Sequence, residues 1–323
     1  MQKDINIIII GAGPIGIACA LACENRNWNY RVLEKGALTN SLFNYPLNMS
    51  FFSTSEKLEI DHIPFISNNP KPTRNEALEY YRRVTTSNQL KINLYEKVET
   101  IEKRNDEFLI TSDKARYQAD KVIIATGFYD IPNPLNVEGE QLPKVMHYYK
   151  EAHPYTLQEV AVVGASNSSV DAALEIYRKG GNVAMIVRGA QIGERVKYWV
   201  RPDILNRIEE GSIKAFFNSE IKTITPHQIT VATPEGLKHL PNDYVLALTG
   251  YRPNFDFLKQ AGVHFSEDKK HIPTYDDETM ETNVKGLYLA GVICGGMETH
   301  KWFIENSRIH AKLIAAHIEQ HLK

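Results

Sequence analysis

The chain has 323 residues, of which 43% are hydrophobic and 24% are charged, as in a globular enzyme with a sizeable core. Its net charge of −2 provides no field for nucleic acid or an anionic membrane, and no segment approaches the roughly 20 apolar residues of a membrane-spanning helix. Three cysteines and the lack of a signal-peptide pattern exclude a secreted disulfide framework and favour the cytoplasm.

The first predicted elements are a strand, a glycine turn and a helix. The apolar run at residues 5–10 is typical of a buried parallel strand, and Gly11, Gly13 and Gly16 follow it as G-x-G-x-x-G. These glycines allow a tight turn, a close approach of a pyrophosphate to the main chain, and packing of the helix on the strand. Pro14 suits the first helical turn. The helix N-terminus would face the phosphates, so we predict a dinucleotide site here.

A second strand, at residues 30–36, carries the next part of this pattern. It ends near Glu34, 18 residues after Gly16, where an acid binds ribose hydroxyls. An acid at this strand end disfavours a 2′-phosphate. The first site is therefore predicted to hold FAD or NAD rather than NADP.

The same design repeats at residues 159–189. A short strand is followed by a turn at residues 164–169, in which serines stand where the second and third glycines would be, and then by a helix through Tyr177. The next strand, at residues 182–189, ends with Arg188 rather than an acid. A guanidinium at this position suits a 2′-phosphate, so the second site is predicted to bind NADPH.

The later segments return the chain between the two nucleotide sites. Residues 119–132 and 242–254 are near copies, each a strand that ends in a turn, and a late strand is predicted over residues 282–292. A helix over residues 303–322 is expected to direct its N-terminus at a flavin.

These elements predict an α/β protein with two Rossmann-like dinucleotide-binding domains, one inserted in the other. The FAD domain is expected at residues 1–150 and 256–323, and the NADPH domain at residues 151–255. No cluster of His, Cys, Asp or Glu has the spacing of metal ligands, so no metal is expected.

Several long segments carry a family resemblance. The chain is similar over its full length to the low-molecular-weight thioredoxin-reductase-like flavoproteins, and within them it resembles the YpdA family of bacillithiol disulfide reductases. This resemblance implies FAD, NADPH, a homodimer and thiol-redox work in the cytoplasm. The matching segments are residues 41–60, 71–84, 137–155, 197–204 and 302–318.

The motifs and the resemblance together give a set of expected cofactor-binding residues. For FAD these are Gly11, Gly13, Pro14, Ile15, Gly16, Glu34, Lys35, Asn48, Ser53, Val98, Thr126, Gly127, Gly291 and Ile304. For NADPH they are Gly164, Ser166, Asn167, Ser168 and Arg188.

The cysteines depart from the family pattern. Thioredoxin reductases proper carry a C-x-x-C pair, which is absent here, and the YpdA turn resembles G-x-G-P-C-G, whose cysteine position is Ile15 in this chain. Isoleucine cannot attack a disulfide. Cys19 and Cys23 are expected to pack in the first helix, whereas Cys294 is a candidate thiol because a helix start near it would lower its pKa. No catalytic residue is therefore assigned, and Cys294 is the candidate.

The electron acceptor stays open between a small-molecule disulfide and an electron-carrier protein. Ferredoxin- or flavodoxin-NADP reductases of this fold also lack C-x-x-C, and the segment at residues 138–155 resembles faintly the pattern of flavin monooxygenases. A redox sensor that binds both nucleotides without steady turnover is a further alternative.

Overall fold

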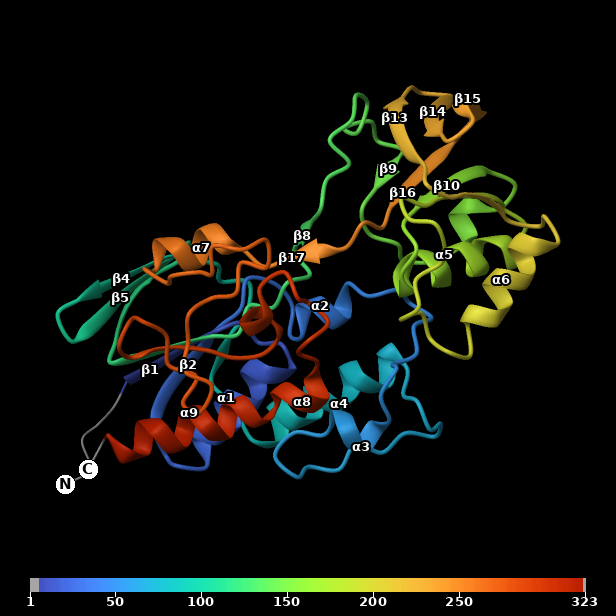
Figure 1. Cartoon of the computed structure of the whole chain (residues 1–323). Coiled ribbons are helices and arrows are strands. Elements are labelled where there is room, and N and C mark those ends of the chain that lie inside the picture. Colours follow the sequence, from blue (N-terminus) through green and yellow to red (C-terminus); the bar gives the residue numbers. More distant parts are fainter. Residues whose placement is uncertain (1–5, 322–323) are drawn as a thin grey trace. The chain divides into compact units, whose positions relative to one another are not determined.

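Two parallel sheets organise the chain, one in each of two units (Figure 1). The computed structural model describes residues 6–321. The first unit holds the chain up to Phe43, residues 49–131 and the chain from Tyr251, and the second holds residues 44–48 and 132–250. Within the described residues, no helix combines the length and the apolar character needed to cross a membrane.

The parallel sheet of the first unit has the order β18-β7-β1-β2-β3. All four isoleucines of β1 are buried, as expected for a strand that is covered on both faces. Helices α1 and α9 run side by side against this sheet (Figure 1). The sheet strands are β1 (Asn6–Ile10), β2 (Asn29–Leu33), β3 (Ile92–Asn93), β7 (Lys121–Ile124) and β18 (Leu287–Leu289).

The first unit also contains a three-stranded antiparallel sheet and a set of helices. The antiparallel strands are β4 (Val98–Arg104), β5 (Glu107–Ser112) and β6 (Arg116–Ala119). The helices are α1 (Pro14–Glu24), α2 (Asn40–Phe43), α3 (Ser55–Leu58), α4 (Arg74–Ser87), α7 (Phe255–Gln260), the 3₁₀ turn η2 (Val292–Gly295), α8 (Ile304–Ser307) and α9 (Ile309–Gln320).

The second unit repeats this plan, with a parallel sheet of order β9-β16-β10-β11-β12 and its own antiparallel sheet β13-β14-β15. The internal repeat predicted from the sequence is therefore confirmed. Its strands are β9 (Val145–Met146), β10 (Glu159–Val163), β11 (Asn182–Ile186), β12 (Lys214–Phe216), β13 (Glu220–Ile224), β14 (Gln228–Thr233), β15 (Gly236–Pro241) and β16 (Tyr244–Ala247). Its helices are η1 (His153–Tyr155), α5 (Asn167–Arg178) and α6 (Arg201–Glu209).

The boundaries of the second unit differ from those expected. We expected residues 151–255, but the unit begins at Pro132, because β9 pairs with β16 and so belongs to the second parallel sheet. It ends at Gly250. The two short strands β8 (Ile131–Pro132) and β17 (Tyr251–Arg252) pair with each other where the chain passes between the units.

The second unit also includes a short segment from early in the chain, residues 44–48. Leu47 N–H donates to the carbonyl oxygen of Lys150 at 2.9 Å, and the Asn48 amide donates to Glu175 Oε1 on α5 at 2.7 Å. The chain therefore passes between the two units four times rather than twice.

Three predicted elements are corrected. The helix expected over residues 303–322 is divided into α8 and α9 at Arg308, whose guanidinium donates to the carbonyl oxygens of Glu56 and Glu59. The late strand is only β18, because the preceding residues turn at Gly286, where φ is 87°. The first strand begins at Asn6, and residues 5 and 322 lie outside the described part.

Candidate functional site

The first glycine turn follows β1 and has the packing that its sequence predicts. Gly11 has a φ of 103°, and a Cβ there would lie 2.6 Å from the Ala125 carbonyl oxygen. A Cβ at Gly16 would lie 1.9 Å from the Gly11 carbonyl oxygen. At Gly13, in contrast, a Cβ would meet no atom within 4 Å. The turn is therefore closed by its first and third glycines and open at the second, where a ligand could approach the main chain.

Glu34 lies directly after β2, beside this turn, and only 6% of it is exposed. Its Oε2 accepts the Ala12 N–H at 2.8 Å and its Oε1 accepts the Gly36 N–H at 2.9 Å. Burial raises the pKa of this carboxyl. The carboxyl thus joins the ends of β1 and β2, at the edge where a parallel sheet receives a nucleotide.

The residues of this site fit a bound dinucleotide. Helix α1 begins at Pro14 with no side-chain cap and no acid in its first turn, so its free N–H groups and dipole are available to an anion. The buried Thr126 Oγ1 has no hydrogen-bond partner among residues 6–321. A buried hydroxyl without a partner is costly, and a ligand oxygen beside it would relieve that cost.

The other residues predicted to bind FAD lie in several elements, and some of them contact other side chains. Lys35 forms an ion pair with Asp130 at 2.6 Å, and Ser53 Oγ donates to Glu305 Oε2 at 2.5 Å. Asn48 lies in the second unit rather than the first. Elsewhere in the first unit are Val98 at the start of β4, Gly127 with a φ of 73°, and Ile304 at the start of α8.

Ile15 is buried beside Gly291. Only 8% of it is exposed, and a Cβ at Gly291 would touch its side chain at 3.4 Å. Gly291 itself has a φ of 87° and lies directly before η2. The position at which the resemblance expects a thiol is therefore filled by an aliphatic side chain that packs on the end of the β18 segment.

The three cysteines are all buried, and burial raises the pKa of each thiol. Cys19 and Cys23 lie inside α1, as expected. The expectation that a helix start lowers the pKa of Cys294 is wrong: this residue lies within the four-residue turn η2 and has no exposed surface. A thiol in this state is a poor nucleophile.

A buried histidine that the sequence analysis missed lies beside Cys294. His310 of α9 is 1% exposed, and its Nδ1 accepts the Gly291 N–H at 3.1 Å and lies 3.8 Å from Cys294 Sγ. Nδ1 therefore carries no proton, and burial lowers the pKa of His310 to about 4. No sequence motif marks such a residue, because only the tertiary fold brings α9 to Gly291.

The second turn, after β10, resembles the first. Gly164 has a φ of 130°, and a Cβ there would lie 2.7 Å from the Leu248 carbonyl oxygen. Ser166 is the N-cap of α5 but makes no side-chain cap, and Ser168 is exposed in the first turn. Asn167 is engaged elsewhere: its Oδ1 accepts the Lys197 N–H at 2.8 Å and its amide donates to the Arg195 carbonyl oxygen at 3.2 Å.

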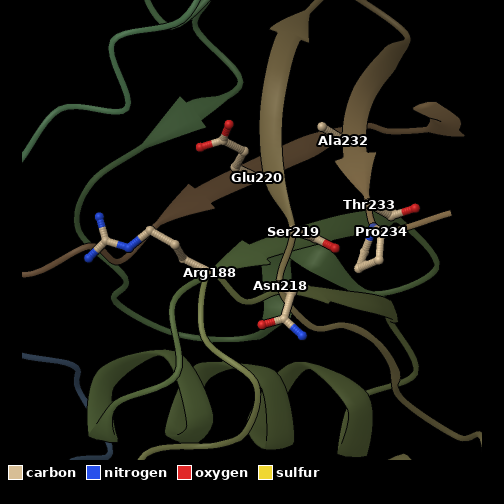
Figure 2. A pocket seen from close by; sticks show the side chains of 7 residues that line it. All are labelled: Arg188, Asn218, Ser219, Glu220, Ala232, Thr233 and Pro234. Carbon is tan, nitrogen blue, oxygen red and sulfur yellow. The ribbon is translucent and has the colours of Figure 1, made fainter. Parts of the chain in front are cut away.

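Arg188 follows β11 and is exposed beside a pocket of about 230 Å³ (Figure 2). The pocket is formed beyond the carboxyl ends of β11 and β12, the edge at which parallel sheets bind nucleotides. Sequence reasoning missed its other residues, although Asn218 follows the end of β12 as Arg188 follows the end of β11. The pocket is lined by Arg188, Asn218, Ser219, Glu220, Ala232, Thr233 and Pro234. Within residues 6–321, no group of three or more His, Cys, Asp or Glu could hold a metal.

Comparisons with known proteins agree with this geometry. Residues 8–291 match the family model of the pyridine nucleotide-disulphide oxidoreductases. The chain is 42% identical over 313 residues to bacilliredoxin reductase Bdr of Bacillus subtilis, covering 96% of each chain. The solved bacillithiol disulfide reductase Bdr (YpdA) of Bacillus cereus is 40% identical, with a TM-score of 0.96 over 98% of this chain and 99% of that one.

A more distant structure supports the fold. Thioredoxin reductase of Lactococcus lactis has a TM-score of 0.78 at 18% identity, over 98% of this chain and 99% of that one. The expected thioredoxin-reductase-like α/β fold is thus confirmed. Together these matches show that the chain belongs to the pyridine nucleotide-disulphide oxidoreductase family, is a flavin-dependent oxidoreductase, and falls within the YpdA (Bdr) branch of that family.

Proposed function

We propose that this chain is an NADPH-dependent FAD oxidoreductase of the bacillithiol disulfide reductase type. The observation that carries the proposal is the strand–turn–helix that occurs once in each unit. In the first unit its turn lies beside the buried acid Glu34, and in the second unit its turn lies beside the exposed Arg188. An acid suits a ribose without a 2′-phosphate, as in FAD, and a guanidinium suits the 2′-phosphate of NADPH. The expected homodimer and cytoplasmic location remain predictions.

Each residue then has a defined task. The open main chain at Gly13 and the start of α1 would bind the FAD pyrophosphate, Glu34 would accept hydrogen bonds from the ribose, and Thr126 would bond a cofactor oxygen. The start of α5 would bind the NADPH pyrophosphate, and Arg188 its 2′-phosphate. When bound, FAD supplies the chemistry of accepting a hydride from NADPH.

The route from the cofactor to the acceptor cannot use a cysteine at position 15. All three cysteines are buried with raised pKa values, so none of them is suited to attack a disulfide. We therefore propose that the acceptor is reduced without a thiol relay on this chain. The same observation favours a second candidate function, the transfer of single electrons to a ferredoxin or flavodoxin.

A thiol-blocking experiment tests this route. The native protein is treated with iodoacetamide, reduced with NADPH in a stopped-flow instrument, and mixed with bacillithiol disulfide, a flavodoxin or a ferredoxin. We expect unchanged rates after treatment and in the Cys294→Ser variant, because no cysteine takes part in the proposed route. Faster reoxidation by the disulfide than by the carriers supports the first candidate function, and the reverse supports the second.

The control for this experiment is a Cys294→Ser variant. Loss of disulfide reduction in both the alkylated protein and this variant would contradict the thiol-independent route and restore Cys294 as the reacting group. A purified protein that has no flavin spectrum and takes up no added FAD would refute the proposed function as a whole.

Arg188→Ala is expected to lower the preference for NADPH over NADH about tenfold, which is the loss of roughly one charge-assisted hydrogen bond to a phosphate. The measurement is kcat/KM for flavin reduction by each nucleotide. Arg195→Ala is the matched control, because Arg195 is an exposed arginine of the same unit that does not line the pocket. An unchanged ratio in Arg188→Ala would show that Arg188 does not bind the 2′-phosphate.

A further inference from the structure

The pocket that Arg188 lines also contains a carboxylate, that of Glu220 at the start of β13. Figure 2 shows the two side chains extending to the same side of β13. Lys222 is the main cause of the lowered pKa of Glu220, and the Arg188 guanidinium lowers this pKa further, so the charges of Arg188 and Glu220 interact. Among the described residues, Arg188 has no carboxylate within ion-pair distance, so Glu220 acts on it from further away.

Glu220 is itself bound by a second cation. Lys222 forms an ion pair and a hydrogen bond with its carboxylate, and this contact is the largest cause of the lowered pKa of Glu220. The register of β13 against β14 shifts between Ile221 and Thr223, a bulge that can redirect a side chain. Lys222 stands at this bulge and is exposed, with Glu220, while Ile221 between them is buried.

The pocket therefore contains an anion beside the cation predicted to bind a phosphate. A 2′-phosphate carries up to two negative charges, so a carboxylate in the same pocket repels it, whereas a ribose hydroxyl is uncharged and is hardly affected. A lysine that pairs with the carboxylate reduces this repulsion. The charges of Arg188, Glu220 and Lys222 would together set how strongly the site prefers NADPH over NADH.

We propose that Glu220 is a specificity residue that weakens binding of the 2′-phosphate at Arg188, and that Lys222 limits this effect by pairing with Glu220. The proposal rests on the proposed function, because it takes NADPH to bind with its 2′-phosphate at Arg188. It adds that the preference for NADPH over NADH is balanced by two charges on β13 of the second unit.

The test is isothermal titration calorimetry of the FAD-loaded protein with adenosine 2′,5′-bisphosphate and with 5′-AMP. Glu220→Gln should lower the Kd for the bisphosphate about two- to fivefold, and Lys222→Met should raise it by a similar factor, the size that exposed charge pairs support. Neither change should alter the Kd for 5′-AMP. Both effects should shrink at high salt, because exposed charges are screened.

Glu235→Gln is the matched control. Glu235, in the turn between β14 and β15, forms an exposed ion pair with Lys238 of β15 at 2.6 Å. It does not line the pocket, and its pKa responds to Lys238 without a contribution from Arg188. Its removal should leave both dissociation constants unchanged. Thermal melts check that all variants are folded.

Two results would overturn the inference. Only the second of them would also overturn the assignment of the 2′-phosphate to Arg188. If Arg188→Ala weakens bisphosphate binding while Glu220→Gln and Lys222→Met leave it unchanged, the inference fails and the NADPH site stands. If Arg188→Ala itself leaves bisphosphate binding unchanged, the assignment of the 2′-phosphate to Arg188 fails, and the inference fails with it.

Discussion

Replacing Gly16 with alanine is expected to lower the free energy of unfolding by about 3 kcal/mol and to reduce flavin binding with it. The new Cβ would lie 1.9 Å from the Gly11 carbonyl oxygen, which is main chain and cannot rotate away. Gly11 cannot shift easily either, because its N–H donates to the Leu33 carbonyl oxygen at 2.8 Å and its Cα faces the Ala125 carbonyl. Urea unfolding of the flavin-free protein measures the effect.

Gly13→Ala is the matched comparison, three residues earlier in the same turn. A Cβ there meets nothing within 4 Å, so the flavin-free protein should be as stable as the wild type to within about 0.5 kcal/mol. The FAD content of the purified protein should nevertheless fall, because the Cβ enters the space that the pyrophosphate would use. Full flavin content in Gly13→Ala would contradict this site, and wild-type stability in Gly16→Ala would contradict the close packing of the turn.

Acid is expected to destabilise the protein through His310 in a defined pH range. Burial lowers the pKa of His310 to about 4, so between this value and the usual 6.5 the unfolded chain binds a proton that the folded protein does not. The contribution of neutral His310 to the free energy of unfolding is therefore fully present above pH 6.5 and is lost as the pH falls toward 4. The shift corresponds to about 3 kcal/mol over this range.

The main physical cause is burial of the ring, and the hydrogen bond that Nδ1 accepts from the Gly291 N–H also favours the neutral form. Protonated Nδ1 could not accept the Gly291 N–H, and of the charges near the ring Asp277 raises its pKa while Lys301 lowers it. His310→Gln should flatten the dependence of the unfolding free energy on pH between 4 and 6.5, and His300→Gln, a change at an exposed histidine, should not. An NMR titration that places the His310 pKa near 6.5 would refute this prediction.

The sequence predicts most of this fold because the signals that define it are local. The run of isoleucines before Gly11 and the valines before Gly164 report burial on both faces of a strand, and the glycine spacing reports the turn. These features need no knowledge of distant contacts, so both parallel sheets and the repeat between them could be anticipated. Glu34 and Arg188 could be placed for the same reason, since each lies within two residues of the end of a strand.

The errors come from contacts between distant parts of the chain. β9 has only two residues and no pattern of its own, so its pairing with β16, and with it the boundary at Pro132, was not predictable. Cys294 looked like a thiol near a helix start, but its burial depends on α9 and on η2. Glu220 and Lys222 are ordinary exposed charges in the sequence, and only the fold brings one of them to the pocket of Arg188.

The segment at residues 44–48 has a consequence for protein engineering. A fragment of residues 132–250 contains all strands of the second parallel sheet, yet it would lack the N–H that bonds the Lys150 carbonyl and the amide that bonds Glu175. Tyr149 also donates to Glu175, at 2.7 Å, so this carboxylate would keep Tyr149 and lose Asn48. A graft of the second unit into another reductase should therefore include a copy of residues 44–48. This peptide can be fused through a linker or added as a separate chain.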